Sequence, residues 1–411
     1  MKSAIVEESL LAFHFPRTKK RPASLFLTSL MSLCSLCPAA EPRQLPYPPS
    51  DILAGLEWTS EPHVYPGIVS DMHWHTWAAD NSIYCIDGDG AFFGGKESFI
   101  NLARITGTPL NHKIELVTNF RELDIRWKQT PQVMQRYGCG PVAVGTDLYV
   151  TLYDYDWRNP DNKIVEVNRY SKQGGIGGII LSRDGGKTWS DVPKKGAPQF
   201  LGPNYGCLDF IGFGPGYTGV PDELAGYVYA VSNDSNWASG DHMYLARVPR
   251  DKILDRSAWE FFSGKANAPE WSKSEDAAKP IFRDPGHVGH SGMTYNAPLK
   301  RYLLSVWSDT IPHSESATEA EVKTWDKQSE LQMYEGPTPW GPWGLVYRED
   351  PWGGPDHSCY LPHLPGKWLG SDGLTGWMLY SGDWILDHHP KREYYGFVTR
   401  GFRLLPKSAS N

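Results

Sequence analysis

The sequence is poor in the features that mark zinc-binding, nucleotide-binding and nucleic-acid-binding proteins. It has only 6 cysteines in 411 residues, and those after residue 40 form neither a CxxC nor a cysteine–histidine pattern typical of zinc sites. Its glycine-rich stretches lack the Lys-Ser/Thr pair of a phosphate-binding loop. The formal net charge of −7, without a long basic run, disfavours nucleic acid and anionic membranes as partners.

Only one apolar run approaches the length of a targeting segment, and it lies near the start of the chain. A basic region over residues 17–21 precedes the apolar run Leu25–Cys37, and residues 38–40 are small enough for cleavage. The run of about 13 residues is short for a membrane span. We therefore expect a signal peptide with an N-terminal extension over residues 1–40, a linker over 41–56, and a secreted or periplasmic protein without an integral membrane segment. The alternative interpretations are a lipoprotein signal around Cys34 or Cys37 and a disordered N-terminus.

Turn-forming and aromatic residues, by contrast, are abundant. The 41 glycines and 33 prolines favour many turns and short strands over long helices. The 17 tryptophans and 21 tyrosines are many for a soluble protein, and we expect most of them in the core. Because exposed aromatic rings stack on the C–H faces of sugars, the composition is compatible with an all-β protein that binds carbohydrate.

A degenerate repeat between residues 57 and 411 decides the predicted architecture. Each unit has an inner strand, a turn and a second strand that ends at an aspartate. The second strands are SIYCID to Asp87, DLYVTLYD to Asp154, YVYAVSND to Asp234, RYLLSVWSD to Asp309 and GWMLYSGD to Asp383. Third and fourth strands follow in most units, with YYGFVTR and FRLLP as those of the last unit. Five such units predict a single domain, a five-bladed β-propeller of three- to four-stranded antiparallel blades.

Two polar insertions, each of which could either rim a substrate groove or be a surface loop without a role, and one structural turn motif stand out along the chain. Residues 157–174 are expected to form a long loop, and residues 310–328 a loop with a short solvated helix. Residues 182–189, SRDGGKTW, match the Asp-box pattern S-x-D-x-G-x-x-W, which marks propeller hairpins rather than active sites. Cys139 and Cys207 both follow Tyr-Gly in neighbouring units, so they could form a disulfide or stay as buried thiols.

The stretch Ser70–Gly90, SDMHWHTWAADNSIYCIDGDG, is predicted to form a hairpin that carries the catalytic residues. Residues that favour strands occupy both arms, and Asp80 and Asn81 tolerate the positive φ of a tight turn. Folding about this turn places Asp71 roughly opposite Asp89, and directly paired residues have Cβ atoms about 4.5–5.5 Å apart. Two carboxyl groups so close repel, so that one pKa rises while the other group stays ionised, as in retaining glycosidases.

Further candidate pocket residues come from the ends of inner and second strands, which shape the channel and pocket of a propeller. The candidates for contacts with the substrate are Trp74, His75, Asp154, Asp209, His290 and Tyr295. The aspartates that end the second strands are expected to cap hairpins in most blades. No cofactor is expected, although clustered aspartates could hold a structural calcium ion.

Five phrases of the sequence resemble those of a known family, and the resemblance runs from about residue 57 to residue 405. They are WHTWAADNSIYCIDGDG, SFINLARITGTP, GHSGMTYNAPLKRYLL, YEGPTPWGPW and KWLGSDGLTGWMLYSGD. They are similar to a secreted family first catalogued only as a domain of unknown function and related to endo-D-arabinofuranosidases. This resemblance implies a five-bladed propeller and a glycoside hydrolase whose catalytic acids match Asp71 and Asp89. The family's aromatic-Gly-Asp-Gly reads Ile86-Asp87-Gly88-Asp89-Gly90 here, so Asp87 and Asp89 both stay candidates for that position.

These observations predict a secreted glycoside hydrolase that cleaves a furanoside- or uronate-containing polysaccharide by a retaining mechanism, with the two aspartates as nucleophile and acid/base. The alternative enzyme is a polysaccharide lyase, with His290 and Tyr295 or His75 and Tyr137 as base and acid. A third hypothesis is a non-catalytic glycan-binding propeller. In each case the partner is a polysaccharide or oligosaccharide, and the protein is expected to be a monomer.

Overall fold

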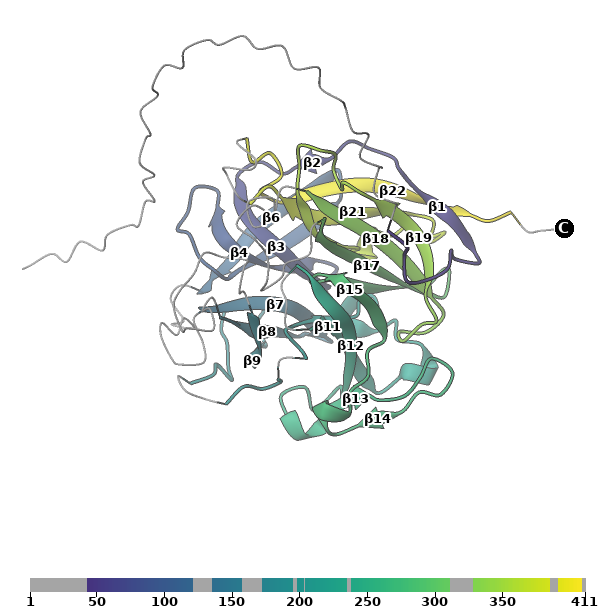
Figure 1. Ribbon diagram of the computed structural model, residues 1–411. Helices are drawn as coiled ribbons and strands as arrows, with labels where there is room; N and C mark the ends of the chain where they lie inside the picture. Colours follow the sequence, from purple (N-terminus) through teal and green to yellow (C-terminus); the bar gives the residue numbers. More distant parts are fainter. Residues whose placement is uncertain are drawn as a thin grey trace, which may run out of the picture. The chain divides into compact units, whose positions relative to one another are not determined.

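The computed structural model describes residues 43–120, 135–156, 172–194, 198–202, 204–234, 238–310, 328–384 and 391–408. The chain from Leu45 onward forms one compact unit. Its described residues form five antiparallel sheets arranged in a ring, a five-bladed β-propeller (Figure 1). The prediction of an all-β, five-bladed propeller is confirmed. Within the described residues, no helix combines the length and apolar character needed to cross a membrane.

The first four blades are meanders in which consecutive strands pair. Blade one is β3 (Ile68–Trp77), β4 (Ile83–Phe92), β5 (Asn101–Thr108) and β6 (Asn111–Asn119). Blade two is β7 (Gln135–Val144), β8 (Asp147–Asp156) and β9 (Lys172–Ser182). Blade three is β10 (Cys207–Phe210), β11 (Tyr227–Asn233), β12 (Gly240–Pro249), β13 (Glu260–Phe262) and β14 (Trp271–Ser272), with β15 (Phe282–Val288) also paired to β12. Blade four is β16 (Gly292–Asn296), β17 (Arg301–Asp309), β18 (Ser329–Gly336) and β19 (Gly344–Glu349).

The fifth blade closes the ring with a strand from the beginning of the unit. It contains β20 (Cys359–His363), β21 (Thr375–Gly382) and β22 (Val398–Pro406). β1 (Leu53–Trp58) pairs antiparallel with β22, and in Figure 1 the purple β1 lies beside the yellow β22. The short β2 (His63–Val64) also pairs with β22. The prediction that FRLLP is a separate fourth strand is wrong, because these residues complete β22 and β1 supplies the fourth strand.

The connections contain short 3-10 helices and structured turns. The helices are η2 (Pro215–Tyr217), η3 (Asp222–Leu224), η4 (Arg256–Ala258), η5 (Glu275–Ala277) and η6 (Gly366–Trp368). In the turn after β9, the Asp184 carboxylate accepts hydrogen bonds from the backbone N–H groups of Lys187 and Thr188, at 3.0 and 2.9 Å. The loop expected before β9 and the helix expected before β18 lie mostly outside the described residues.

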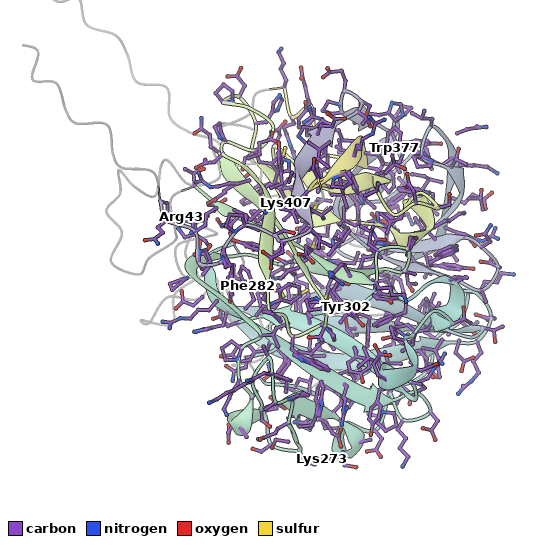
Figure 2. The ribbon with its side chains drawn as sticks, turned by 90° about the vertical axis from the view of Figure 1, so that its right-hand side faces the viewer. Arg43, Lys273, Phe282, Tyr302, Trp377 and Lys407 are labelled. Atoms are coloured by element: carbon purple, nitrogen blue, oxygen red, sulfur yellow. The ribbon has the colours of Figure 1, made fainter. Side chains whose placement is uncertain are left out.

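Packing joins the blades to one another. The main hydrophobic core includes side chains from the sheets of all five blades, among them Phe282 and Tyr302, which are labelled in Figure 2. A smaller cluster joins the first blade to the last, with Ile68 from β3, Leu379 from β21 and Phe397 just before β22. The four described cysteines are buried free thiols, including Cys139 and Cys207, so the structure corresponds to the unpaired alternative.

Because β1 closes the ring, its buried side chains should contribute directly to stability. Leu56 is 7 % exposed and lies opposite Leu404 of β22. Leu56→Ala is expected to lower the free energy of unfolding by about 2–3 kcal/mol, since the substitution leaves a cavity at the closure. Urea denaturation measures this change. The exposed neighbour Glu57 is the control, and Glu57→Ala should change stability by about 0.5 kcal/mol or less. An equally stable Leu56→Ala protein would contradict a closing role for β1.

Candidate functional site

The strand that carries Asp71 is irregular around this residue. The pairing of β3 with β4 shifts on both sides of Asp71, which lies opposite Gly88. The next two residues, Met72 and His73, have φ angles of 77° and 44°. Residues other than glycine rarely adopt positive φ, and when they do the surrounding structure must hold them, often at functional sites. The predicted pairing of Asp71 with Asp89 is therefore off by one residue, because these bulges change the register.

Asp71 is a buried acid whose pKa is raised into the neutral range. Its side chain is 7 % exposed, and its Oδ2 accepts a hydrogen bond of 3.0 Å from the Tyr360 hydroxyl. Its Oδ1 has no hydrogen-bond partner among the described residues. Burial is the main cause that raises the pKa of Asp71 to about 7, and the charge of Asp87 adds to it, while Tyr360 and Arg392 oppose the shift. A carboxyl group with this pKa can donate a proton at neutral pH.

Asp89 lies near Tyr395, as Asp71 does, but its side chain faces solvent. It is solvent-exposed, and its backbone carbonyl accepts a hydrogen bond of 2.7 Å from the Tyr395 hydroxyl. Burial raises the pKa of Tyr395, and the charges of Asp71 and Asp89 raise it further. The Arg392 guanidinium lies 3.6 Å from the centre of the Tyr395 ring. Two carboxyl groups, one buried and one exposed, therefore lie close to one phenol.

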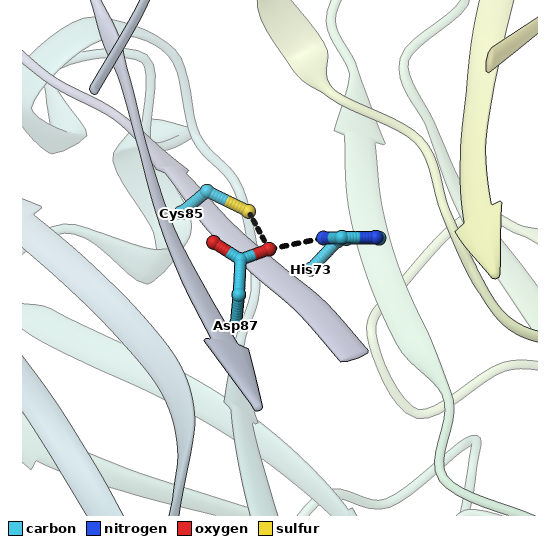
Figure 3. Close-up of side chains that lie close together, drawn as sticks. All are labelled: His73, Cys85 and Asp87. Atoms are coloured by element: carbon cyan, nitrogen blue, oxygen red, sulfur yellow. Dashed lines mark hydrogen bonds and ion pairs between the residues drawn. The ribbon is translucent and has the colours of Figure 1, made fainter. Parts of the chain in front are cut away.

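A buried hydrogen-bonded group of three side chains lies on β3 and β4, the two strands that carry the acids (Figure 3). The Nδ1 atom of His73 is hydrogen-bonded to Oδ1 of Asp87, and the Cys85 thiol donates to the same oxygen at 3.5 Å. The other ring nitrogen of His73, Nε2, donates to the backbone carbonyl of Gly396 at 2.8 Å. Asp87 is 1 % exposed and already bonded, so Asp89 is the accessible acid of the two candidates.

The same three side chains are of the types that bind transition metals. Their donor atoms lie within 4.8 Å of one another. However, His73 and Asp87 are joined by a direct hydrogen bond, which satisfies both atoms without an ion between them. The group could take up a divalent cation only if this hydrogen bond opened.

Two of the residues predicted to bind substrate line a separate small cavity. His75 of β3 and Asp209 of β10 meet His363 of β20 toward the carboxyl ends of the inner strands. The cavity offers about 20 Å³ to the centres of water molecules, which is room for water rather than for a sugar ring. Burial lowers the pKa of His75 to about 4 and that of His363 well below its usual value, and raises that of Asp209. Burial thus disfavours the charged form of all three side chains, which line the interior of the ring.

Asp209 gives a stability prediction with a defined sign. Because burial raises its pKa, the folded protein binds more protons than the unfolded chain, whose aspartate pKa is about 3.9. The contribution of Asp209 to stability therefore falls as the pH rises above about 4. Asp209→Asn cannot ionise, so it should be more stable than the wild type at pH 8 by about 1 kcal/mol or more, and this advantage should shrink at pH 4. Thermal unfolding at both pH values tests this, and a variant that is no more stable at pH 8 would refute it.

The other predicted contacts are buried in the core or fall outside the described side chains. The ring of Trp74, which is completely buried, lies 5.6 Å from the ring of His290 and 4.8 Å from that of His363, so it is no sugar platform. Burial also holds the pKa of His290 well below its usual value. Asp154 lies two residues before the end of β8, so the predicted strand end at this residue is wrong, and its side chain lies outside the described residues.

The two residue pairs considered for a lyase have separate surroundings. The His290 ring packs against Tyr153, whereas the Tyr295 ring packs against Phe213 and Tyr302 at 5.6 and 5.0 Å. Similarly, the ring of His75 lies against His363 and that of Tyr137 against Phe99 and Tyr153. The ring contacts of the described residues therefore join neither pair.

Sequence reasoning missed two residues of the site. Arg392 and Tyr395 come from the segment before β22; Tyr395 falls in YYGFVTR, which the repeat predicts as an ordinary strand of the last unit, but β22 starts only at Val398. They reach Asp71 and Asp89 because the first and last blades are neighbours in a closed ring. The closure of the ring could have indicated these two residues, since it places the segment before the last strand beside the first blade.

Residues 140–344 match one family model. It is described as a domain of unknown function, DUF4185. The match runs from within β7 to the first residue of β19, and the hairpin with Asp71 and Asp89 lies before it. A search of curated proteins found no match.

Solved structures give matches across most of the chain. A Bacteroides ovatus protein described provisionally as a hydrolase is 13 % identical, with 84 % of this chain and 87 % of that chain covered and a TM-score of 0.48. An α-L-arabinofuranosidase from Podospora anserina, in complex with cellotriose, is 14 % identical, with 87 % and 99 % covered and a TM-score of 0.44. A GH43_1 enzyme from Xanthomonas citri is 11 % identical, with 86 % and 92 % covered and a TM-score of 0.44.

Proposed function

We propose that the protein is a secreted glycoside hydrolase that cleaves a furanoside- or uronate-containing polysaccharide with retention of configuration. The observation that carries this proposal is that Asp71, which is buried, and Asp89, which is exposed, both lie close to the phenol of Tyr395. Retaining glycosidases need one protonated carboxyl group and one ionised carboxylate on the two sides of the scissile bond. Burial of Asp71 supplies the first, and the solvent-exposed position of Asp89 suits the second.

The roles follow from these environments. Asp71 donates its proton to the glycosidic oxygen as the bond to the anomeric carbon breaks, while the Asp89 carboxylate attacks that carbon and forms a glycosyl ester. Asp71, now ionised, then takes a proton from a water molecule that attacks the anomeric carbon and releases Asp89. The Tyr360 hydroxyl holds Oδ2 of Asp71, which leaves Oδ1 to carry the proton that is transferred.

The substrate and the location of the protein are parts of the same proposal. The resemblance to the family of endo-D-arabinofuranosidases favours an arabinofuranoside among the candidate glycans. The basic and apolar segments within residues 17–40 favour export, which would give the enzyme access to an external polysaccharide. We expect it to act as a monomer.

A glycan panel tests the proposal. Purified protein is incubated with arabinans, arabinogalactans, xylans and uronate-containing polysaccharides, and new reducing ends and ultraviolet absorbance are read together. New reducing ends without absorbance support a hydrolase. Products that absorb, as the unsaturated sugars of a lyase do, would overturn it in favour of the lyase hypothesis. Saccharide binding without new reducing ends across the panel would instead favour a binding propeller.

A further inference from the structure

The hydrogen bond between His73 and Asp87 joins the two backbone segments that carry the candidate catalytic acids. His73 lies two residues after Asp71 on β3, and Asp87 lies two residues before Asp89 on β4. The bond therefore bridges the two strands at the same distance along the chain from each acid (Figure 3). Both side chains are buried, at 0 and 1 % exposure, so water does not compete for the bond.

The backbone around Asp71 needs such a tether. Met72 and His73 both have positive φ, and two such residues in succession persist only where neighbours hold them. His73 is held through both ring nitrogens, and its ring lies 5.0 Å from that of Phe397. Met72 packs against Gly88 of β4. Its terminal methyl carbon fills the space beside this glycine, only 1.8 Å from where a Cβ atom at position 88 would lie. Every residue between Asp71 and Trp74 is thus anchored on β4 or on the last blade.

We propose that His73 and Asp87 are positioning residues that fix the separation of the Asp71 and Asp89 carboxyl groups. This inference rests on the proposed hydrolase function, since the separation of the two carboxyl groups sets the course of glycoside hydrolysis. The pair does not touch the substrate. It acts through the backbone, by holding β3 and β4 together at the bulge.

The repeat supplies a matched control. In the sequence repeat, Asp234 of blade three occupies the position that Asp87 occupies in blade one, although β4 continues past Asp87 and Asp234 directly follows β11. Its Oδ2 accepts from the backbone N–H of His242 at 3.1 Å and lies 3.2 Å from the ring Nδ1 of the same residue, on β12. Asp234→Ala thus removes a carboxylate with a histidine partner from another blade, without touching β3 or β4.

The test compares three variants, each checked by thermal unfolding. Asp87→Ala should lower kcat by about 100-fold with little change in KM, since small misplacements of catalytic groups have this effect. Asp87→Asn should keep kcat within about threefold of the wild type, because the Asn amide can donate to Nδ1 of a neutral His73 and preserve the tether. Asp234→Ala should keep the wild-type kcat even if it lowers stability. If Asp87→Ala does not fold, His73→Ala takes its place with the same expected loss.

The outcomes separate this inference from the proposed function. Wild-type kcat in folded Asp87→Ala, or an equal loss in Asp87→Asn and Asp87→Ala, would overturn the positioning role while the hydrolase stands. If the wild type cleaves no glycan, the proposed function is removed, and the positioning role is then tested by crystal structures of the wild type and of Asp87→Ala. The same distance between the Asp71 and Asp89 carboxyl groups in both structures would overturn the inference. Stoichiometric zinc in the purified protein, measured by mass spectrometry of the elements, would also overturn it, since an ion rather than the hydrogen bond would then join the strands.

Discussion

Asp89→Asn is expected to lower kcat by about 10⁴-fold or more, which is the scale of loss when an enzyme is deprived of its nucleophile. The amide has nearly the same size as the carboxylate but cannot form the glycosyl ester. The Tyr395 hydroxyl bonds to the backbone carbonyl of this residue, so the substitution leaves that contact intact. The measurement is release of reducing ends from the glycan that the wild type cleaves.

Asp251→Asn is the control for this variant, because Asp251 is also an exposed aspartate but lies in the third blade. It should retain wild-type turnover. The thermal unfolding curves of both variants should match that of the wild type. Turnover within tenfold of the wild type in a folded Asp89→Asn protein would remove Asp89 from the mechanism.

Asp71→Asn is expected to lower kcat by about 10²–10⁴-fold on natural glycans, the usual contribution of a general acid. The loss should be smaller on aryl glycosides with good leaving groups, because these need little protonation when the glycosidic bond breaks. Comparing one substrate of each kind under identical conditions measures the difference. An equal loss on both substrates would assign Asp71 a role other than that of the acid.

The pH dependence of wild-type activity should show the titration of Asp71. The pKa of Asp71 is raised to about 7, and the acid must be protonated to act, so activity should fall as the pH rises through about 7. The falling limb should vanish in Asp71→Asn, because the amide does not ionise. A variant that keeps the limb would show that another group is titrating.

The fold could be predicted from the sequence because each blade repeats the same local signal. β17 illustrates this, since its apolar run is buried from Tyr302 to Asp309 between two neighbouring strands. The closing strand could not be predicted in the same way. Most of the segment Leu53–Trp58 lies before the repeat, and its partner is set by the closure of the ring rather than by any neighbour in the chain.

The sequence predicted that Asp71 and Asp89 share one hairpin, but it did not predict the geometry of that hairpin. Regular pairing of the two hairpin arms predicted that Asp71 lies opposite Asp89. The positive φ angles of Met72 and His73, which change this register, could not be predicted from these residue types. Burial was the other unknown. His75 and Asp209 were correctly expected at the inner strands, but only the packing of the ring shows that the space beside them is too small for a sugar.

The pairing of β1 with β22 has a consequence for biosynthesis. Partners in this sheet, such as Glu57 and Arg403, are 346 residues apart. The ribosome makes β1 before every other strand of the ring and β22 after them. Until β22 is made, β1 has no strand to pair with, and its unpaired edges are exposed to other chains. We expect the last blade to assemble late and slowly, as contacts of long sequence separation do, and the nascent protein to aggregate more readily than the finished one.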